Sequence, residues 1–170
     1  DFGIIGMTEP QYDPNRCVAC EQCIKYCKKR SVDALSLVNG KIVRDTKKCI
    51  GCGVCITYCP TRAWTRSKEH YFRLVILGRT GKRNPRLAED FIKWCDEESI
   101  LKIAANTYAY IEEYIDPEAV ENKEHIGYIV DRTGFEKFKE YIFRDVSLSE
   151  KAEVAQEVYW GGKHYDRYGG

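Results

Sequence analysis

The sequence predicts an α+β fold in which a small cysteine-rich module is inserted in a larger α/β half-domain. Two observations lead to this prediction. Eight of the nine cysteines lie between Cys17 and Cys59, where one cysteine motif occurs twice. The stretches on both sides have the apolar patterns of strands and helices instead. We expect an opening strand of the half-domain at 1–10, the module at 11–66, the rest of the half-domain at 67–150 and a C-terminal tail at 151–170.

The two cysteine motifs have the same spacing. Each reads C-x2-C-x2-C-x3-C, first over residues 17–27 and then over residues 49–59, and Pro60 follows the second. This spacing is typical of bacterial ferredoxins that hold two [4Fe–4S] clusters. Three closely spaced cysteines can bind three corners of a cubane, and in these ferredoxins the fourth ligand comes from the other motif. The spacing therefore predicts a two-[4Fe–4S] bacterial ferredoxin-like module.

The crossed pattern assigns each cysteine of the motifs to one cluster. The first cluster takes Cys17, Cys20, Cys23 and Cys59, and the second takes Cys49, Cys52, Cys55 and Cys27. Three other interpretations are weaker. Zinc prefers two pairs of ligands, and a disulfide framework suits a secreted protein. The C-x5-C and C-x3-C spacings inside the first motif also resemble cluster ligands next to sirohaem, but they leave Cys20 and the second motif unexplained.

The composition is that of a globular chain without a membrane span. The sequence has 170 residues, of which 44% are hydrophobic and 31% charged. No apolar run approaches the roughly 20 residues that cross a bilayer. Nine cysteines without a visible secretion signal indicate a reducing, anaerobic cytoplasm. The sequence starts at Asp1 and enters an apolar stretch at once, so we expect that the N-terminal part of a longer protein precedes it.

The net charge of +1 conceals an uneven distribution. Residues 11–66 carry eleven Lys/Arg and four Asp/Glu, a net +7, whereas residues 67–170 carry a net −4. Some of these cations adjoin the cluster ligands, where positive charge raises a cluster's reduction potential. They form either a solvated rim or a docking face for an acidic redox partner. No aromatic-basic module for nucleic acid accompanies them. The cations next to the ligands are Lys28, Lys29, Arg30, Lys47 and Lys48.

Short elements are expected around the motifs. Residues 2–7 predict a strand, and a short helix should follow Cys23. Segments 34–38 and 41–44 alternate around Asn39-Gly40, the turn favoured in two-residue hairpins. Within the second motif, Gly51 and Gly53 allow the backbone to approach the sulfurs. Tyr26 and Tyr58 each precede the last cysteine of a motif, and we expect them to shield the clusters from water.

The second half of the chain predicts two strands and two helices. Residues 71–77 have the pattern of a buried strand, and a glycine-rich basic loop follows it at 78–86. A long amphipathic helix should run from about 97 to 115, a short strand from 125 to 130 and a second helix from 133 to about 144. Thr133 and Glu136 are spaced as a capping box for that last helix.

Individual residues of this half also carry predictions. We expect Cys95 to be a buried, inert thiol rather than a ligand. The tail from Val154 should lie over the surface or reach a neighbouring chain. The long helix should bury the stripe Ile100, Ile103, Ala104, Thr107, Tyr108, Ile111, Tyr114 and Ile115, and the last helix should bury Phe135, Phe138, Tyr141 and Ile142.

The segments that flank the cysteine motifs carry a resemblance to a known family, since the motifs themselves occur in many ferredoxins. These segments are residues 1–6, 74–86, 124–134 and 158–160. With them, nearly the whole chain resembles the sirohaem nitrite/sulfite reductase family, in particular the type found in the C subunit of anaerobic sulfite reductase. The resemblance implies a C-terminal half-domain of the nitrite/sulfite reductase type with the ferredoxin module inserted in it.

The resemblance implies an oxidoreductase that reduces sulfite to sulfide with six electrons at sirohaem, fed by the two ferredoxin clusters. Sirohaem and a third [4Fe–4S] cluster would belong to the full-length enzyme, with their cysteines before Asp1. This chain alone should hold two clusters, contain no catalytic residue and be inactive on sulfite. Expected partners are the missing N-terminal part, other subunits of the complex or an electron donor protein, not nucleic acid or a membrane. Candidates for contact with sirohaem carboxylates or a companion domain are Arg79, Lys82, Arg83 and Arg86.

Two alternatives to this function stay open. A stand-alone two-cluster electron carrier with a docking domain would explain the same motifs. A nitrite reductase would use the same cofactor pair on a chemically similar anion.

Overall fold

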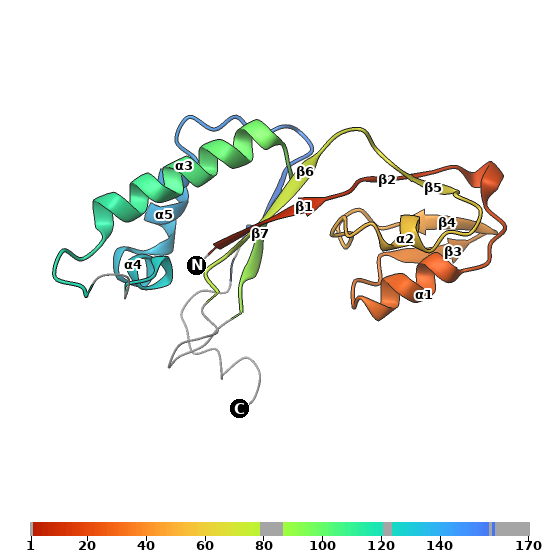
Figure 1. The fold of residues 1–170 in the computed structure, drawn as a ribbon, viewed down its shortest axis with the longest axis horizontal. Helices are drawn as coiled ribbons and strands as arrows, with labels where there is room; N and C mark the ends of the chain where they lie inside the picture. The colour runs from red at the N-terminus through yellow and green to blue at the C-terminus, as the bar shows by residue number, and fades with distance from the viewer. Residues whose placement is uncertain (1, 79–86, 121–123, 157, 159–170) are drawn as a thin grey trace, which may run out of the picture. The chain divides into compact units, whose positions relative to one another are not determined.

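The computed structural model describes residues 2–78, 87–120, 124–156 and 158 (Figure 1). The chain forms two compact units. One is continuous in sequence, from Gly6 to Tyr71, and is called the cysteine unit below. The other combines Asp1–Ile5 with Phe72–Gly170 and is called the sheet unit. Strand β1 (Phe2–Met7) begins in the sheet unit and ends in the cysteine unit.

The cysteine unit contains two small antiparallel sheets and two short helices in the order β-α-β-β-α-β. Strand β2 (Pro10–Tyr12) pairs with β5 (Trp64–Arg66), and β3 (Leu35–Val38) pairs with β4 (Lys41–Arg44). The 3-10 turn η1 (Pro14–Arg16) and helix α1 (Gln22–Lys29) follow β2, and α2 (Val54–Thr57) precedes β5. The predicted hairpin is confirmed, with φ of 50° at Asn39 and 75° at Gly40.

The core of the cysteine unit is small and rich in cysteine. It places Trp64, Leu35 and Ile42 against the cysteines of both motifs. A core of this size supplies little hydrophobic stabilisation, and small domains of this kind are commonly held together by metal. Its buried members are Cys23, Ile24, Cys27, Ala34, Leu35, Ile42, Cys55 and Trp64.

The sheet unit is built on a four-stranded sheet of order β1-β6-β7-β8. Strands β6 (Tyr71–Ile76), β7 (Glu89–Cys95) and β8 (Glu153–Val154) form consecutive antiparallel pairs. The opening strand at residues 2–7 is thus confirmed, and β6 is its neighbour. Strand β8 adds the first residues of the expected tail to the sheet edge, through Val154 opposite Ile92.

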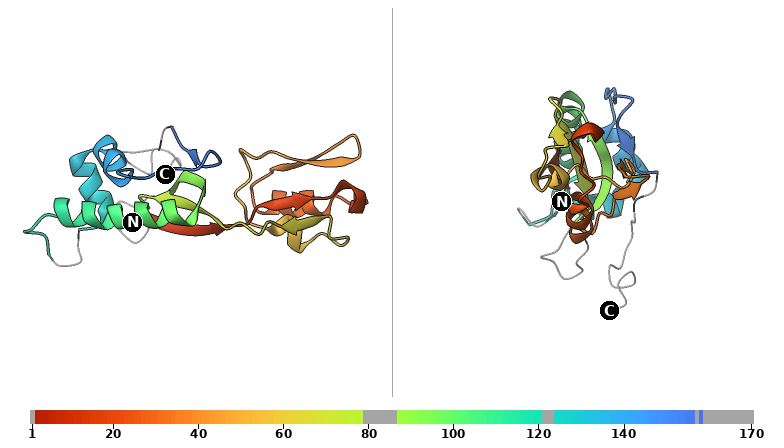
Figure 2. Two further views of the ribbon diagram at one scale, coloured as in Figure 1. Left: turned by 90° about the horizontal axis from the view of Figure 1, so that it is seen from above. Right: turned by 90° about the vertical axis from the view of Figure 1, so that its right-hand side faces the viewer.

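Three helices complete the sheet unit: α3 (Glu97–Tyr114), α4 (Ile126–Thr133) and α5 (Phe135–Ile142). Figure 2 shows α4 and α5 beside the long α3. Asp96 caps α3, because its carboxylate accepts a hydrogen bond from the Ser99 N–H at 2.8 Å. In the described part of the chain, no helix combines the length and the apolar character that crossing a membrane requires.

The predicted strand at 125–130 is wrong, because this segment begins helix α4. Its buried residues are Ile126, Gly127, Ile129 and Val130, which is helical spacing. A short apolar run cannot distinguish a strand from a buried helix by its pattern alone.

The predicted capping box at Thr133 is also wrong. Thr133 is the last residue of α4, and its hydroxyl donates to the Ile129 carbonyl at 2.9 Å and bonds the Tyr110 hydroxyl. Gly134, with φ of 95°, occupies the N-cap position of α5 instead.

Strand β7 was not predicted. The bulges between β6 and β7 and the φ of 56° at Trp94 break the alternation by which a strand is recognised. The buried stripe predicted for α3 is confirmed for Ile100, Ile103 and Thr107 but wrong for two of its members. On α3, Tyr110 is fully buried, whereas Tyr108 and Ile115 are exposed. The inner face of α5 is confirmed for Phe138, Tyr141 and Ile142, with Phe135 partly buried.

Candidate metal centre

The first cysteine cavity gathers three cysteines from the first motif and one from the second. Cys17 follows η1, Cys23 lies in α1, and Cys59 follows α2. Cys20 lies in the loop before α1 and is exposed. The cavity is lined by Cys17, Cys20, Cys23 and Cys59 together with Val18, Glu21, Ile42, Pro60, Thr61, Ala63 and Trp64.

The second cysteine cavity shows the reciprocal arrangement. Cys27, from the first motif, joins the three leading cysteines of the second motif. Each cavity thus contains the four cysteines that the spacing assigns to one cluster. It is lined by Cys27, Cys49, Cys52 and Cys55 together with Pro10, Val32, Ala34, Leu35, Arg44, Ile50, Gly51, Gly53 and Val54.

The two motif loops have the same backbone conformation. Ala19 and Glu21 have φ of 51° and 58°, and Gly51 and Gly53, each 32 residues later, have φ of 61° and 71°. These values lie in the left-handed region, which few residues other than glycine adopt. The first loop adopts this conformation without glycine, so its geometry is held by the surrounding structure.

Gly51 is required for a second reason. A Cβ on this residue would lie 2.8 Å from the Met7 Cβ and 3.1 Å from the Thr8 nitrogen. The Thr8 N–H donates to the Gly51 carbonyl at 2.7 Å, which holds the second motif loop against the segment before β2.

Cys27 and Cys59 are called the crossed cysteines below, because each lines the cavity of the other motif. Backbone N–H groups donate to their sulfurs at equivalent places. The Ala34 N–H donates to Cys27 Sγ at 3.3 Å, and the Ala63 N–H donates to Cys59 Sγ at 3.2 Å. Such N–H···S bonds stabilise thiolate and raise the potential of an iron–sulfur cluster. Arg44 adds a charged donor, with Nη1 3.8 Å from Cys49 Sγ, and is paired with Glu9 at 3.6 Å.

Burial makes three of these thiols hard to ionise. It raises the pKa of Cys23 and Cys27, and it raises the pKa of Cys55 to about 12, where Cys49 and Cys52 contribute further. Cys59 differs. Burial raises its pKa, but hydrogen bonds from the backbone of Trp64, from the side chain and backbone of Thr61 and from the backbone of Ala63 together lower it below its usual value. Thiolates bind metal, so a cation in these cavities must displace the protons.

The residues present fit a cubane cluster in each cavity. Four cysteines lining one small cavity are the ligand set of [4Fe–4S]. In the first cavity the indole N–H of Trp64 supplies a further observation, because its nitrogen is buried and has no acceptor within bonding geometry among the described residues. A buried donor without an acceptor costs about 1–3 kcal/mol. Cluster or thiolate sulfur would supply that acceptor.

The alternatives to a cluster receive no support. All nine cysteines lie in the described residues and all are free thiols, so no disulfide framework exists. Within the same residues, no three His, Cys, Asp or Glu side chains converge on a position for a single metal ion. The ligands of one zinc ion stand about 2.3 Å from it, whereas those of a cubane bind four separate irons and stand farther apart.

Tyr26 and Tyr58 lie face to face. Their ring centroids are 3.5 Å apart and their planes differ by 9°. This stack joins α1 to the end of α2, and each ring precedes a crossed cysteine in the chain. Lys29 Nζ lies 5.1 Å from the centroid of the Tyr26 ring. The sequence indicated the equivalence of the two tyrosines but not their contact.

The cations beside the ligands are exposed to solvent: Lys28, Lys29, Arg30, Lys47 and Lys48. Lys28 Nζ lies 4.0 Å from the Asp33 carboxylate, and such exposed pairs contribute little to stability. The basic residues predicted to contact sirohaem or a companion domain, Arg79, Lys82, Arg83 and Arg86, lie outside the described residues.

Cys95 has the surroundings predicted for an inert thiol. It is fully buried in the core of the sheet unit, at the end of β7. Burial raises its pKa to about 11, and the charge of Asp96 adds to this rise.

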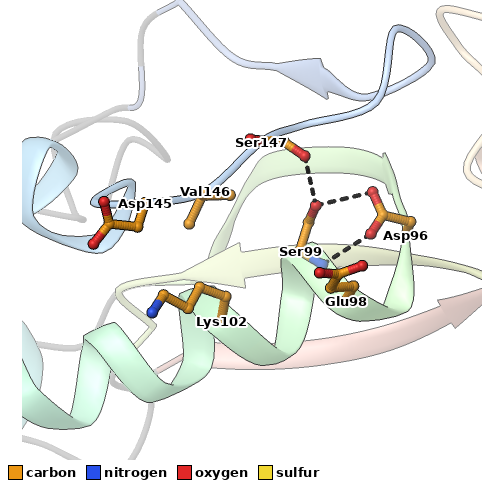
Figure 3. A pocket seen from close by; sticks show the side chains of 7 residues that line it. All are labelled: Asp96, Glu98, Ser99, Lys102, Asp145, Val146 and Ser147. Atoms are coloured by element: carbon orange, nitrogen blue, oxygen red, sulfur yellow. Dashed lines mark hydrogen bonds between the residues drawn. The ribbon is translucent and has the colours of Figure 1, made fainter.

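A larger depression, of about 500 Å³, lies in the sheet unit (Figure 3). The Ser99 hydroxyl donates to Asp96 at 2.9 Å or to the Ser147 carbonyl at 3.1 Å. These bonds cap α3 and fasten the segment after α5 to it. The depression therefore has a structural explanation, and it contains no cysteine.

The family model of the nitrite and sulphite reductase 4Fe-4S domain matches residues 1–151. The chain belongs to this family. The C subunit of the anaerobic sulfite reductase of Salmonella typhimurium is 39% identical over 160 residues, which cover 94% of this chain and 47% of that protein. The protein of the same name from Salmonella typhi has the same identity and coverage. The chain thus spans about half the length, 47%, of the curated relatives it matches.

A solved structure shares the fold of this family member. The crystal structure of dissimilatory sulfite reductase I superposes with a TM-score of 0.59 at 15% identity, covering 95% of this chain and 41% of that chain. The expected resemblance to the nitrite/sulfite reductase family is thereby confirmed.

Sequence reasoning found the eight motif cysteines but missed Trp64. Its signal was available in the repeat of the motif: Ala34-Leu35 and Ala63-Trp64 both follow a crossed cysteine and both begin a strand. Aligning the two motifs with their following strands would have placed Trp64 against the first group of cysteines.

Proposed function

We propose that this chain is the electron-transfer part of an anaerobic sirohaem sulfite reductase. One observation carries the proposal: each of two cavities is lined by four cysteines, three from one motif and one from the other. Membership of the nitrite and sulfite reductase 4Fe-4S domain family supports it, as does the 39% identity to the C subunit of an anaerobic sulfite reductase.

In this proposal, the Gly6–Tyr71 unit is a two-cluster ferredoxin-type module. Cys17, Cys20, Cys23 and Cys59 hold one [4Fe–4S] cluster, and Cys49, Cys52, Cys55 and Cys27 hold the other. One-electron transfer is the chemistry that such clusters supply when bound. The protein's contribution is to fix the thiolates, to donate N–H groups to their sulfurs and to limit contact with water.

The sheet unit has a different role. Its core is large and made of aliphatic and aromatic residues, and its described residues contain one cysteine, which is buried. We assign it to the reductase half-domain, which would contact sirohaem and its own [4Fe–4S] cluster in the full-length enzyme. The basic residues Arg79, Lys82, Arg83 and Arg86 remain the proposed contacts to sirohaem carboxylates or to a companion domain.

The full-length gene product tests the relay. It should show sirohaem absorption, and a low-potential donor should reduce that sirohaem rapidly. Cys27→Ala and Cys59→Ala should leave the sirohaem spectrum in place but slow its reduction and the release of sulfide from sulfite. Sirohaem reduction at the wild-type rate in both variants would exclude the relay, and a full-length product without sirohaem would favour the stand-alone carrier. Comparing sulfite with nitrite as the electron acceptor decides the substrate.

A further inference from the structure

Trp64 is placed to act on only one of the two cavities. It begins β5 and is 3% exposed, and its side chain lines the cavity of Cys17, Cys20, Cys23 and Cys59. It packs in the same buried cluster as Cys23. Its Nε1 is itself buried, and no acceptor in the described part of the chain satisfies it.

The orientation of the indole is fixed by its neighbours. The Tyr12 ring packs against it with centroids 4.7 Å apart, and β2 and β5 pair Tyr12 directly with Trp64. The Tyr12 hydroxyl in turn accepts a hydrogen bond from the Ile42 N–H at 3.2 Å. The indole therefore has little freedom to change its orientation in the lining of the cavity.

The equivalent position in the other cavity is Leu35. Ala34 and Ala63 make the same N–H···S bond to their crossed cysteines, so the residues after them, Leu35 and Trp64, correspond. Both are buried and both line their own cavity. The leucine side chain carries no donor, which makes the two cavities unequal at this point.

We propose that Trp64 is a positioning residue that donates its indole N–H to a sulfur in the first cavity, of a cysteine or of the cluster, and raises the reduction potential of that cluster. A hydrogen bond to sulfur favours the reduced, more negative state of a cluster. The inference rests on the proposed function, since it requires clusters bound in both cavities. It concerns only the effect of Trp64 on one cluster and does not rank the two potentials. Arg44 donates to Cys49 in the other cavity and influences that cluster separately.

Trp64→Phe tests the proposal, because phenylalanine keeps an aromatic ring and removes the donor. In the cluster-loaded chain, a redox titration followed by EPR should show one of two potentials shifted to a more negative value and the other unchanged. Trp94→Phe is the matched control, a buried tryptophan of the sheet unit, and should shift neither potential. Two unchanged potentials in Trp64→Phe with full iron content would overturn the proposal.

A second measurement covers the case in which Trp64→Phe loses iron. Pulsed EPR on the otherwise unaltered chain labelled with ¹⁵N-tryptophan should detect an indole nitrogen coupled to one reduced cluster, and the signal should persist in Trp94→Phe. Absence of that coupling from a chain with two clusters would also overturn the proposal. A chain that binds no clusters would instead contradict the proposed function, so the two failures are distinguishable.

Discussion

Cys27 and Cys59 have equivalent places in the chain and equivalent backbone donors, although they line different cavities. Each is the last cysteine of its motif, and each accepts a backbone N–H bond from an alanine. Each lines the cavity formed mainly by the other motif. This exchange is what separates the crossed assignment from one in which each motif holds its own cluster.

The crossed assignment predicts which variants share a phenotype. Cys59→Ala should lose the same cluster as Cys20→Ala, and Cys27→Ala the same cluster as Cys52→Ala. Each variant should retain about four irons, and the EPR spectrum of the reduced cluster that remains should agree within each pair. Cys20 and Cys52 are exposed, so their replacement disturbs packing little. Agreement of Cys59→Ala with Cys52→Ala would show that the assignment is wrong.

Cys95 is predicted to be structural. Cys95→Ala should keep the iron content of the unaltered chain, because its thiol is buried in the other unit. Its pKa is raised from 9.0 to about 11 in the folded state, chiefly by burial, so folding favours the protonated thiol. The corresponding stability is fully present below pH 9 and is lost as the pH rises toward 11.

Urea unfolding at several pH values measures this effect. Between pH 9 and 11 the free energy of unfolding should decrease more steeply in the unaltered chain than in Cys95→Ala. Equal slopes would mean that the Cys95 thiol does not titrate differently in the two states. Loss of iron in Cys95→Ala would show that it participates in a metal site.

Among the secondary-structure elements, the second motif loop depends most on one glycine. Gly51→Ala combines a φ of 61° with a Cβ 2.8 Å from the Met7 Cβ. Gly40→Ala in the hairpin has a φ of 75° but nothing within 4 Å of the new Cβ. Gly40→Ala should lower the free energy of unfolding only by the cost of placing alanine in left-handed backbone, about 1–2 kcal/mol. Gly51→Ala should lower it more, and should also release iron faster to a chelator.

Thermal or urea unfolding of both variants, with iron release timed beside it, checks this prediction. Equal losses of unfolding free energy in Gly51→Ala and Gly40→Ala would show that contact with the segment before β2 does not constrain the loop.

The sequence was informative where a local pattern determines an element. The Asn39-Gly40 hairpin, β1, β6 and α3 were predictable because turn chemistry, apolar runs and helical spacing are each visible in a few residues. The segment 125–130 was not, since its helix is selected by packing of Ile126, Ile129 and Val130 in the core. Strand β7 was hidden by its bulges.

The candidate site was more predictable than the fold around it. Cysteine spacing alone identified the two groups of four that line the cavities. It could not reveal Trp64 or the Tyr26–Tyr58 stack, because these contacts depend on how strands and helices return to the motif loops. Separation in sequence hides such contacts even when each residue is conspicuous.

In the molecule as a whole, the two units differ in what stabilises them. The sheet unit has a core of aliphatic and aromatic residues from several strands and helices. The cysteine unit has a core in which three of eight buried members are proposed ligands. Folding of such a unit is expected to be coupled to cluster binding.

Removal of the clusters with a chelator and oxidant should therefore affect the units unequally. In the whole chain, amide hydrogen exchange in residues 6–71 should become fast, while α3 and α5 stay protected. Equal loss of protection in both units would contradict separate stabilisation. Unchanged protection in residues 6–71 would show that this unit folds without its clusters.

The content of iron and acid-labile sulfide per chain, measured under anaerobic conditions, tests the central claim most directly. Two cubane clusters predict about eight of each. About four of each would mean that only one cavity holds a cluster, and zinc or no metal in place of iron would contradict the account of both cavities.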